Sequence, residues 1–253
     1  MRNNLVLSIF SGIDLLGVAF EQEGYCVVGF IDTLWGRDIK TFHPIPNVFE
    51  GIIGAPPCQF ASRMRHVFEA QGKRARFGNL IPEFERVVRE AQSTWFLMEN
   101  VREAPTPAID GYFIQTFWLN SRWFGSIQHR ERRFTFGSKR KCSLNLEVVL
   151  FEVNQWTQAV TGDCRAQPVR LLKGGKPKTV LASDNPCNKN KEGKRDYRSI
   201  EDNCELQGLP NDFTKDMPFL KSAKYELIGN GIPLSVGKAF ARAIRVRSEA
   251  TGI

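Results

Sequence analysis

Apolar and polar positions alternate along the first half of the chain with two different periods. Short apolar runs rich in β-branched residues predict four strands, at residues 5–10, 26–32, 48–55 and 94–100. Between them, apolar residues at helical spacing predict helices at residues 14–25 and 78–92. Strands that alternate with helices are typical of a parallel sheet. The pattern therefore predicts an α/β fold.

The pattern changes in the second half of the chain. Residues 111–125 fit either a helix or a strand, and the sequence that follows to residue 138 predicts a strand pair. Residues 139–198 are polar, basic and interrupted by Gly, Pro and Asn, which favours loops. Apolar periodicity returns at residues 200–210 and in a closing helix at 235–247. We therefore expect three parts: an α/β domain at 1–138, a small basic module at 139–198, and a segment at 199–253 that returns to the first domain.

Composition places the chain among ordinary globular proteins, since 42% of its 253 residues are hydrophobic and 25% are charged. No apolar run approaches the roughly 20 residues of a membrane helix, and the N-terminus lacks the pattern of a signal peptide. We therefore expect no membrane association, a cytoplasmic setting and reduced cysteines. The spacing of the six cysteines matches no zinc motif, so no metal is expected.

The net charge of +8 is concentrated in one region of the chain. Residues 138–198 hold thirteen Lys and Arg against six Asp and Glu, a net charge of +7. A second basic cluster occupies residues 63–77. Basic segments of this kind often bind polyanions, but they also form ordinary solvated surfaces. Charge alone leaves both interpretations open.

Three polar residues, Asp32, Cys58 and Glu99, fall just past or at the ends of predicted strands. Functional groups collect at the carboxyl ends of parallel strands. In the first strand-to-helix turn, Gly12 would let a ligand approach bare backbone at a helix N-terminus. Asp32 follows Gly12 by twenty residues, the spacing at which an acidic residue holds ribose hydroxyls. A nucleoside cofactor is therefore indicated, although Asp14 stands where a second glycine would complete the usual pattern.

Two prolines immediately precede Cys58 in the sequence Pro56-Pro57-Cys58. Proline fixes its own backbone and restricts the residue before it, so the thiol is aimed with little conformational freedom. Such a thiol can act as a nucleophile if nearby cations favour its thiolate. The alternative is a buried structural cysteine after a rigid turn.

Two further stretches carry candidate chemistry. Glu99 follows an apolar run, and burial would raise the pKa of its carboxyl, as suits a proton donor or a hydrogen-bonding acid. The alternative is a carboxylate that caps the following turn. The alternating sequence at 127–136 places Gln128, Arg130 and Arg132 on one strand face. That face could be a buried site whose arginines bind a carboxylate and a carbonyl oxygen, or an exposed edge strand kept soluble by charge.

Six stretches, in order along nearly the whole chain, resemble the motifs of the DNA (cytosine-5)-methyltransferase family. They lie at residues 9–25, 54–59, 96–101, 119–134, 197–213 and 226–244, and include Pro-Cys-Gln, Glu-Asn-Val and Gln-x-Arg-x-Arg. The resemblance implies a Rossmann-like sheet that binds S-adenosylmethionine, with residues 139–198 as a small inserted target-recognition region. It also implies a duplex DNA substrate whose target cytosine is flipped out of the helix. We expect the protein to act as a monomer.

The resemblance also implies roles for individual residues. Cys58 would add to C6 of the cytosine, and Glu99 would bind N3. Arg132, with Arg130 alongside, would bind O2 of the base and steady Glu99. The residues that would contact the cofactor are Phe10, Gly12, Asp32, Pro57 and Asn230. The residues that would contact the DNA are Gln59, Ser62, Arg63, Arg65, Asn100 and Gln128, and the loop at 60–77 would close over the flipped base.

The sequence departs from the family pattern in the cofactor turn. Ser8 occupies a position that usually holds an acidic residue, and Asp14 replaces a glycine. Between Asp32 and Glu50 no acidic residue is evident that would contact the adenine. These departures concern the cofactor site and leave the expected fold unchanged.

Other functions remain as alternatives to a DNA methyltransferase. One is the same chemistry on RNA such as tRNA, and another is a DNA-binding relative without catalysis. A nicotinamide-dependent oxidoreductase would explain the first 32 residues but would leave Cys58, Glu99, Arg130 and Arg132 without a role. A cytosine methyltransferase is therefore the preferred interpretation.

Overall fold

A computed structural model describes residues 4–61, 77–126, 128–148 and 199–251. The chain divides into two compact units. Unit 1 comprises Met1–Leu119, Glu131–Asn145 and Ala241–Ile253, and unit 2 comprises Asn120–Arg130 and Leu146–Phe240. The predicted DNA contacts at Ser62, Arg63 and Arg65 lie outside the described residues, as do most of the basic module and most of the loop at 60–77.

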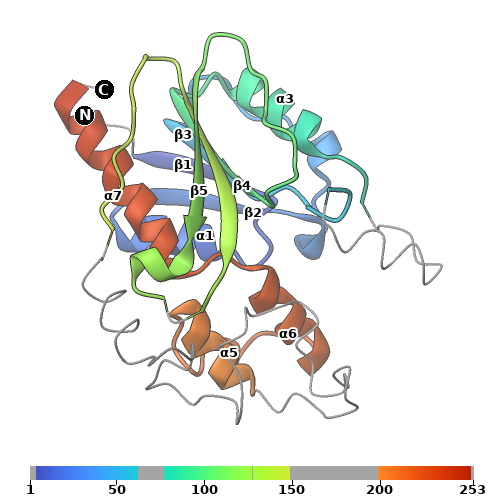
Figure 1. The fold of residues 1–253 in the computed structure, drawn as a ribbon. Coiled ribbons are helices and arrows are strands. Elements are labelled where there is room, and N and C mark those ends of the chain that lie inside the picture. The colour runs from blue at the N-terminus through green and yellow to red at the C-terminus, as the bar shows by residue number, and fades with distance from the viewer. Residues whose placement is uncertain (1–3, 62–76, 127, 149–198, 252–253) are drawn as a thin grey trace. The chain divides into compact units, whose positions relative to one another are not determined.

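A six-stranded sheet has the strand order β2-β1-β3-β4-β6-β5 (Figure 1). Its strands are β1 (Leu5–Ile9), β2 (Cys26–Ile31), β3 (Gly51–Gly54), β4 (Trp95–Asn100), β5 (Phe113–Asn120) and β6 (Glu131–Ser138). β1 pairs in parallel with β2 and β3, and β3 with β4, whereas β6 is antiparallel to β4. The predicted α/β fold with a mostly parallel sheet is confirmed. The ambiguous run at 111–125 forms a strand and then the short 3-10 helix η3 (Ser121–Phe124).

Helices cover both faces of the unit 1 sheet (Figure 1). These helices are α1 (Leu15–Gln22), η1 (Thr33–Trp35), η2 (Ile39–Thr41), α3 (Ile81–Ala91) and the C-terminal part of α7 (Leu234–Thr251). Phe84 of α3 packs edge-on against Phe96 of β4, with ring centroids 5.7 Å apart. The neighbouring residue of β4, Trp95, points to the opposite face and stacks on Phe20 of α1 at 6.0 Å.

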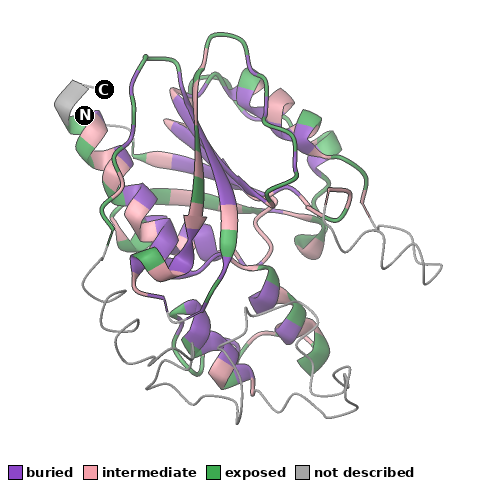
Figure 2. Cartoon of the chain, in the orientation of Figure 1, coloured by how far each residue is buried: buried purple, intermediate pink, exposed green. Residues whose placement is uncertain are grey.

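β3 and β4 are buried along their whole length (Figure 2). Helices on both faces leave no exposed side of these strands, which explains why their sequences are continuous apolar runs. The exceptions in β4 are its last two residues, Glu99 and Asn100, which are polar and only 7% and 2% exposed. Within the described residues, no helix is both long and apolar enough to cross a membrane.

Unit 2 contains α5 (Ile200–Gln207), α6 (Lys221–Asn230), η3 and the N-terminal part of α7. The apolar periodicity at 200–210 therefore corresponds to a helix. Ser199 begins α5 with a capping box, because its hydroxyl accepts from the backbone N of Asp202 and its own N donates to the Asp202 carboxylate, each at 3.0 Å.

One predicted element differs in the structure. The alternating sequence at 127–136 predicted a strand that carries Gln128, Arg130 and Arg132 on one face, but β6 begins only at Glu131. Gln128 and Arg130 precede the strand and belong to unit 2, whereas Arg132 belongs to unit 1. The predicted common strand face is therefore wrong.

Candidate active site

The parallel strands of unit 1 end at one edge of the sheet. Ile9 pairs with Gly54, and Gly54 pairs with Met98, so β1, β3 and β4 end nearly level. The segments that follow β1, β2 and β3, together with the last residues of β4, therefore share this edge. It is the edge at which Asp32, Cys58 and Glu99 were expected from the sequence.

Cys58 is held by the backbone on both sides. Pro56 is buried, and Cys58 is half-buried and forms no disulfide. The Pro56 carbonyl accepts a hydrogen bond from Nδ2 of Asn100 at 3.1 Å, which ties the proline turn to the end of β4. On the other side, the Cys58 carbonyl accepts from the backbone N of Ala61 at 3.0 Å. The turn is thus anchored while Cys58 remains partly exposed.

The other cysteines in the described part of the chain have different surroundings. Cys26 is exposed at the start of β2, and Cys142 and Cys204 are buried. Burial, followed by the charges of Glu201 and Asp212, raises the pKa of the Cys204 thiol to about 11. The thiolate is the nucleophilic form of cysteine. Cys204 is therefore unreactive at neutral pH. The anchored backbone and partial exposure of Cys58 suit a nucleophile.

Glu99 and Arg132 form an ion pair at the same end of β4. Oε1 of Glu99 lies 3.0 Å from Nε of Arg132, and the Glu99 side chain is 9% exposed. Nη1 of Arg132 also donates to the carbonyl of Glu131 at 2.8 Å. The antiparallel pairing of β4 with β6, which places Glu99 opposite Phe134, brings Arg132 within reach. Arg132 therefore orients the Glu99 carboxylate at the end of β4.

Gln128 and Arg130 are buried in unit 2, and both form hydrogen bonds there. Gln128 is fully buried, and its Nε2 donates to the carbonyl of Leu206 at 2.8 Å and to Oε1 of Gln207 at 3.0 Å. Arg130 is 3% exposed, and its carbonyl accepts from the backbone N of Ser121 at 3.0 Å. The structure therefore shows Gln128 bracing η3 and α5 within unit 2, rather than lying on a face shared with Arg132.

The turn after β1 has the features of a small-molecule cradle. Phe10 and Gly12 have left-handed backbones with φ of 52° and 53°, and a Cβ at Gly12 would meet no atom within 4 Å. Gly12 N donates to Oδ2 of Asp32 at 3.1 Å, while Oδ1 of Asp32 accepts from Leu34 N at 2.8 Å. The Ser11 hydroxyl is buried and has no hydrogen-bond partner among the described residues. Open space, an unpaired hydroxyl and a fixed carboxylate with spare lone pairs fit the polar groups of a nucleoside.

Sequence reasoning missed two aromatic residues beside this turn. Phe30 and Trp35 are 53% and 38% exposed, and their rings meet edge to face at 5.1 Å. Trp35 Nε1 donates to the Gly12 carbonyl at 2.7 Å, and Phe30 has a left-handed φ of 67°. Exposed aromatic surface and a strained backbone often mark ligand sites. The available signal was the presence of two aromatic residues within three positions of Asp32.

The remaining predicted site residues are more scattered. Pro57 is half-buried and Gln59 is exposed, both in the Cys58 turn, and Asn100 is buried at the end of β4. Asn230 is exposed at the end of α6 in unit 2. The structure therefore groups Pro57, Gln59 and Asn100 with Cys58 in unit 1, and it does not place Asn230 relative to them.

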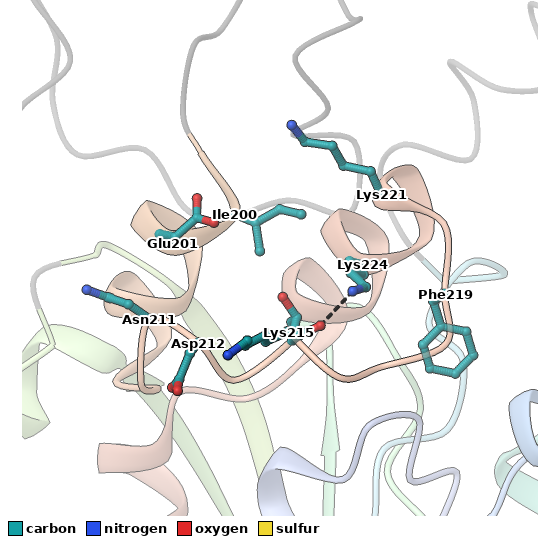
Figure 3. A pocket seen from close by; sticks show the side chains of 9 residues that line it. Ile200, Glu201, Asn211, Asp212, Lys215, Phe219, Lys221 and Lys224 are labelled. Carbon is teal, nitrogen blue, oxygen red and sulfur yellow. Dashed lines mark hydrogen bonds between the residues drawn. The ribbon is translucent and has the colours of Figure 1, made fainter.

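A pocket of about 540 Å³ lies wholly within unit 2 (Figure 3). Lys215, Lys221 and Lys224 line it together with two carboxylates, Glu201 and Asp212. The Nζ of Lys224 is already bonded to the carbonyl of Thr214 at 2.6 Å. This mixed charge gives little preference for a polyanion, and the pocket contains none of the predicted catalytic residues. Within the described ranges, no group of His, Cys, Asp and Glu side chains could hold a metal ion.

Comparison with known proteins adds to this geometry. Residues 34–161, half of the chain, match the family model for C-5 cytosine-specific DNA methylases. The type II methyltransferase M.NgoPII of Neisseria gonorrhoeae is 22% identical, over 95% of this chain and 95% of that protein. M.FnuDI of Fusobacterium nucleatum is 28% identical over 55% of this chain and 48% of its own length.

Solved structures with the same fold include two DNMT2 proteins. A mutant of Spodoptera frugiperda DNMT2 has a TM-score of 0.64 and 15% sequence identity, over 95% of this chain and 99% of that one. The S. pombe Dnmt2 methyltransferase has a TM-score of 0.63 and 13% identity, over 98% and 99%. At this identity the similarity establishes the fold.

Proposed function

Because this chain belongs to the C-5 cytosine-specific DNA methylase family, we propose that it methylates C5 of a cytosine flipped out of duplex DNA through a covalent bond from Cys58. Membership of the family makes the protein a cytosine-5 methyltransferase that uses S-adenosylmethionine. The observation that carries the covalent step is the half-buried Cys58 turn, tied through Asn100 to the strand that bears the Glu99–Arg132 pair.

The proposed reaction begins with attack of the Cys58 thiolate on C6 of the cytosine. C5 of cytosine is a poor nucleophile, and a new Sγ–C6 bond places electron density on C5. The Glu99 carboxyl donates a proton to N3 and so makes the ring a better electron acceptor, while Arg132 holds the carboxyl group of Glu99 and binds O2. S-adenosylmethionine would supply an electrophilic methyl group to C5 and leave as S-adenosylhomocysteine. After transfer, loss of the C5 proton to solvent and cleavage of the Sγ–C6 bond restore the ring and free Cys58.

We propose that the cofactor is held by the turn after β1 and its neighbours. Phe10 and Gly12 offer an open left-handed turn, and Asp32 is positioned to accept ribose hydroxyls. Pro57 and Asn230 complete the proposed cofactor set. The exposed rings of Phe30 and Trp35 add apolar surface for a flat heterocycle.

The proposed substrate is duplex DNA, which the protein binds as a monomer in the cytoplasm. The net charge of +8 supports a polyanionic partner, since basic side chains bind phosphates and release counterions. Gln59, Asn100 and Gln128 are the proposed DNA contacts among the described residues. The basic module at 139–198 would supply target recognition, and phosphate contacts would supply much of the affinity. A flipped base is required because C6 is inaccessible inside the duplex.

A transfer assay tests this proposal. The protein is incubated with labelled S-adenosylmethionine and duplex DNA, tRNA or no nucleic acid, and modified cytosines are mapped. Label in C5 of DNA cytosine is expected, together with a covalent complex on DNA that contains 5-fluorocytosine. Label in tRNA alone would replace the DNA substrate with RNA, and no label anywhere would reject the enzyme.

Cys58→Ser tests the nucleophile directly. The variant should lose transfer and 5-fluorocytosine trapping while DNA binding is kept, because serine is a much weaker nucleophile than a thiolate. Cys26→Ser is the matched control, since Cys26 is an exposed free thiol outside the proposed site. Turnover by Cys58→Ser would exclude the covalent role of Cys58.

A further inference from the structure

A hydrogen-bonded pair of polar side chains, Ser8 and the half-buried Asp14, adjoins the proposed cofactor turn. Ser8, in β1, is 1% exposed, and its hydroxyl donates to Oδ1 of Asp14 at 2.6 Å. The same Oδ1 accepts from the backbone N of Gly17 at 3.0 Å and so caps α1. One carboxylate oxygen of Asp14 therefore ties the end of the turn to both the strand before it and the helix after it.

Two glycines leave room for the Asp14 carboxylate. A Cβ on Gly17 would lie 2.5 Å from the Asp14 carboxylate, and a Cβ on Gly29 would lie 2.3 Å from Oδ2. Gly29 belongs to β2 and Ser8 to β1. The Asp14 carboxylate is thus enclosed by two strands and the first turn of α1.

The backbone of Asp14 needs this support. Asp14 is left-handed, with φ of 57° and ψ of 42°, and Phe10 in the same turn also has a positive φ, of 52°. Left-handed backbone is unfavourable for residues with a side chain, although Asp tolerates it better than most. Strained turns persist only where the surrounding structure holds them. The hydrogen bonds from Ser8 and Gly17 to the Asp14 carboxylate stabilise the C-terminal end of the turn.

The surroundings of the Asp14 carboxylate disfavour its negative charge. Burial raises the pKa of Asp14 to about 6, although its bonds to Ser8 and Gly17 lower it. The nearby carboxylates of Glu21 and Asp32 raise it further. An acidic group kept in unfavourable surroundings beside a ligand cradle is typical of a functional role.

We infer that the Ser8–Asp14 pair is a positioning device that holds the turn at residues 10–14 in the shape that receives S-adenosylmethionine. The inference rests on the proposed cofactor site. Ser8 Oγ and Asp14 Oδ1 are in contact, so a carboxylate on residue 8 would reach the same space if residue 14 were glycine. Glycine also adopts the left-handed backbone of residue 14 without strain. The two departures from the family pattern at Ser8 and Asp14 therefore compensate for each other.

Isothermal titration of the 253-residue chain with S-adenosylmethionine tests this inference without requiring turnover. Asp14→Ala removes both anchoring bonds and should weaken binding by about tenfold or more, whereas Asp14→Asn keeps an acceptor oxygen and should bind within about threefold of the unaltered protein. Ser8→Asp alone sets two carboxylates in contact, and Asp14→Gly alone removes the anchor, so each should weaken binding. The combined Ser8→Asp/Asp14→Gly variant should restore it.

The outcomes separate positioning from plain stability. Each titration is made well below the unfolding midpoint of the variant, with Asp38→Ala as the control because Asp38 is an exposed N-cap outside the proposed cofactor set. Affinity unchanged in every folded variant, or no recovery in the combined variant, would overturn the inference. If the unaltered protein does not bind S-adenosylmethionine at all, the proposed cofactor site fails instead.

Discussion

Substitution of Asp14 by Asn should change how the stability of the protein depends on pH. The carboxyl pKa of Asp14, a half-buried residue, is raised from 3.8 to about 6, chiefly by burial. Between these values the folded state holds a proton that the unfolded state has released. The free energy of unfolding therefore falls as pH rises through this window. The contribution is fully present below pH 3.8 and is lost above about pH 6.

The magnitude follows from the size of the shift. One unit of pKa corresponds to about 1.4 kcal/mol, so the shift from 3.8 to about 6 corresponds to about 3 kcal/mol over the whole window. About 2 kcal/mol of this falls between about pH 4.5 and about pH 7.5. Asn does not titrate, and its amide oxygen can still accept from Ser8 and Gly17. Asp14→Asn should therefore gain about 2 kcal/mol relative to the unaltered protein between these two pH values.

Urea unfolding followed by tryptophan fluorescence measures this difference, since the chain contains five tryptophans. The free energy of unfolding is determined for both proteins at several pH values, and only the difference between them is interpreted, because groups distant from residue 14 titrate equally in both. Asp38→Asn, which removes an exposed carboxylate, is the matched control. A difference between Asp14→Asn and the unaltered protein that stays constant across this range would refute the reasoning.

Three further predictions concern the proposed active site. Arg132→Ala removes the cation 3.0 Å from the buried Glu99 carboxylate and should reduce the rate of single-turnover methyl transfer by about a hundredfold. Arg132→Lys should keep part of this rate, and equal rates in the two variants would contradict the role of the ion pair. Asn100→Ala removes the bond to the Pro56 carbonyl and should slow 5-fluorocytosine trapping while cofactor affinity, measured by titration, stays the same. Trp35→Ala exposes the Gly12 turn and should weaken S-adenosylmethionine binding by about tenfold, whereas Trp35→Phe should weaken it less. Unchanged affinity in Trp35→Ala would exclude the Trp35 ring from the cofactor site.

Residues whose position depends on strand ends were predictable from the sequence. Buried parallel strands produce continuous apolar runs, and each run stops where the strand leaves the core. Asp32, Cys58 and Glu99 follow or end such runs, and parallel pairing brings strand ends to one edge. The motif of two prolines before Cys58 also acts locally, because proline restricts only its own backbone and that of its neighbour.

Contacts between distant or strained positions were decided only by the tertiary structure. Alternation at 127–136 cannot distinguish a strand from extended chain, and only the structure shows that β6 begins at Glu131. Likewise, no spacing along the chain indicates that the side-chain amide of Gln128 donates hydrogen bonds to Leu206 and Gln207 of α5. In the sequence, Ser8 and Asp14 are two separate departures from the family pattern. In the structure, the left-handed turn brings Oγ of Ser8 within 2.6 Å of Oδ1 of Asp14.

The sequence by itself determined the layered α/β fold and the edge of the sheet where chemistry collects, because hydrophobic period and strand ends are local properties. The tertiary structure decided which side chains meet at that edge, because hydrogen bonds and ion pairs depend on distances that no spacing along the chain specifies. Glu99 meets Arg132 through antiparallel pairing. Ser8 meets Asp14 because glycine at positions 17 and 29 leaves the space that one carboxylate fills.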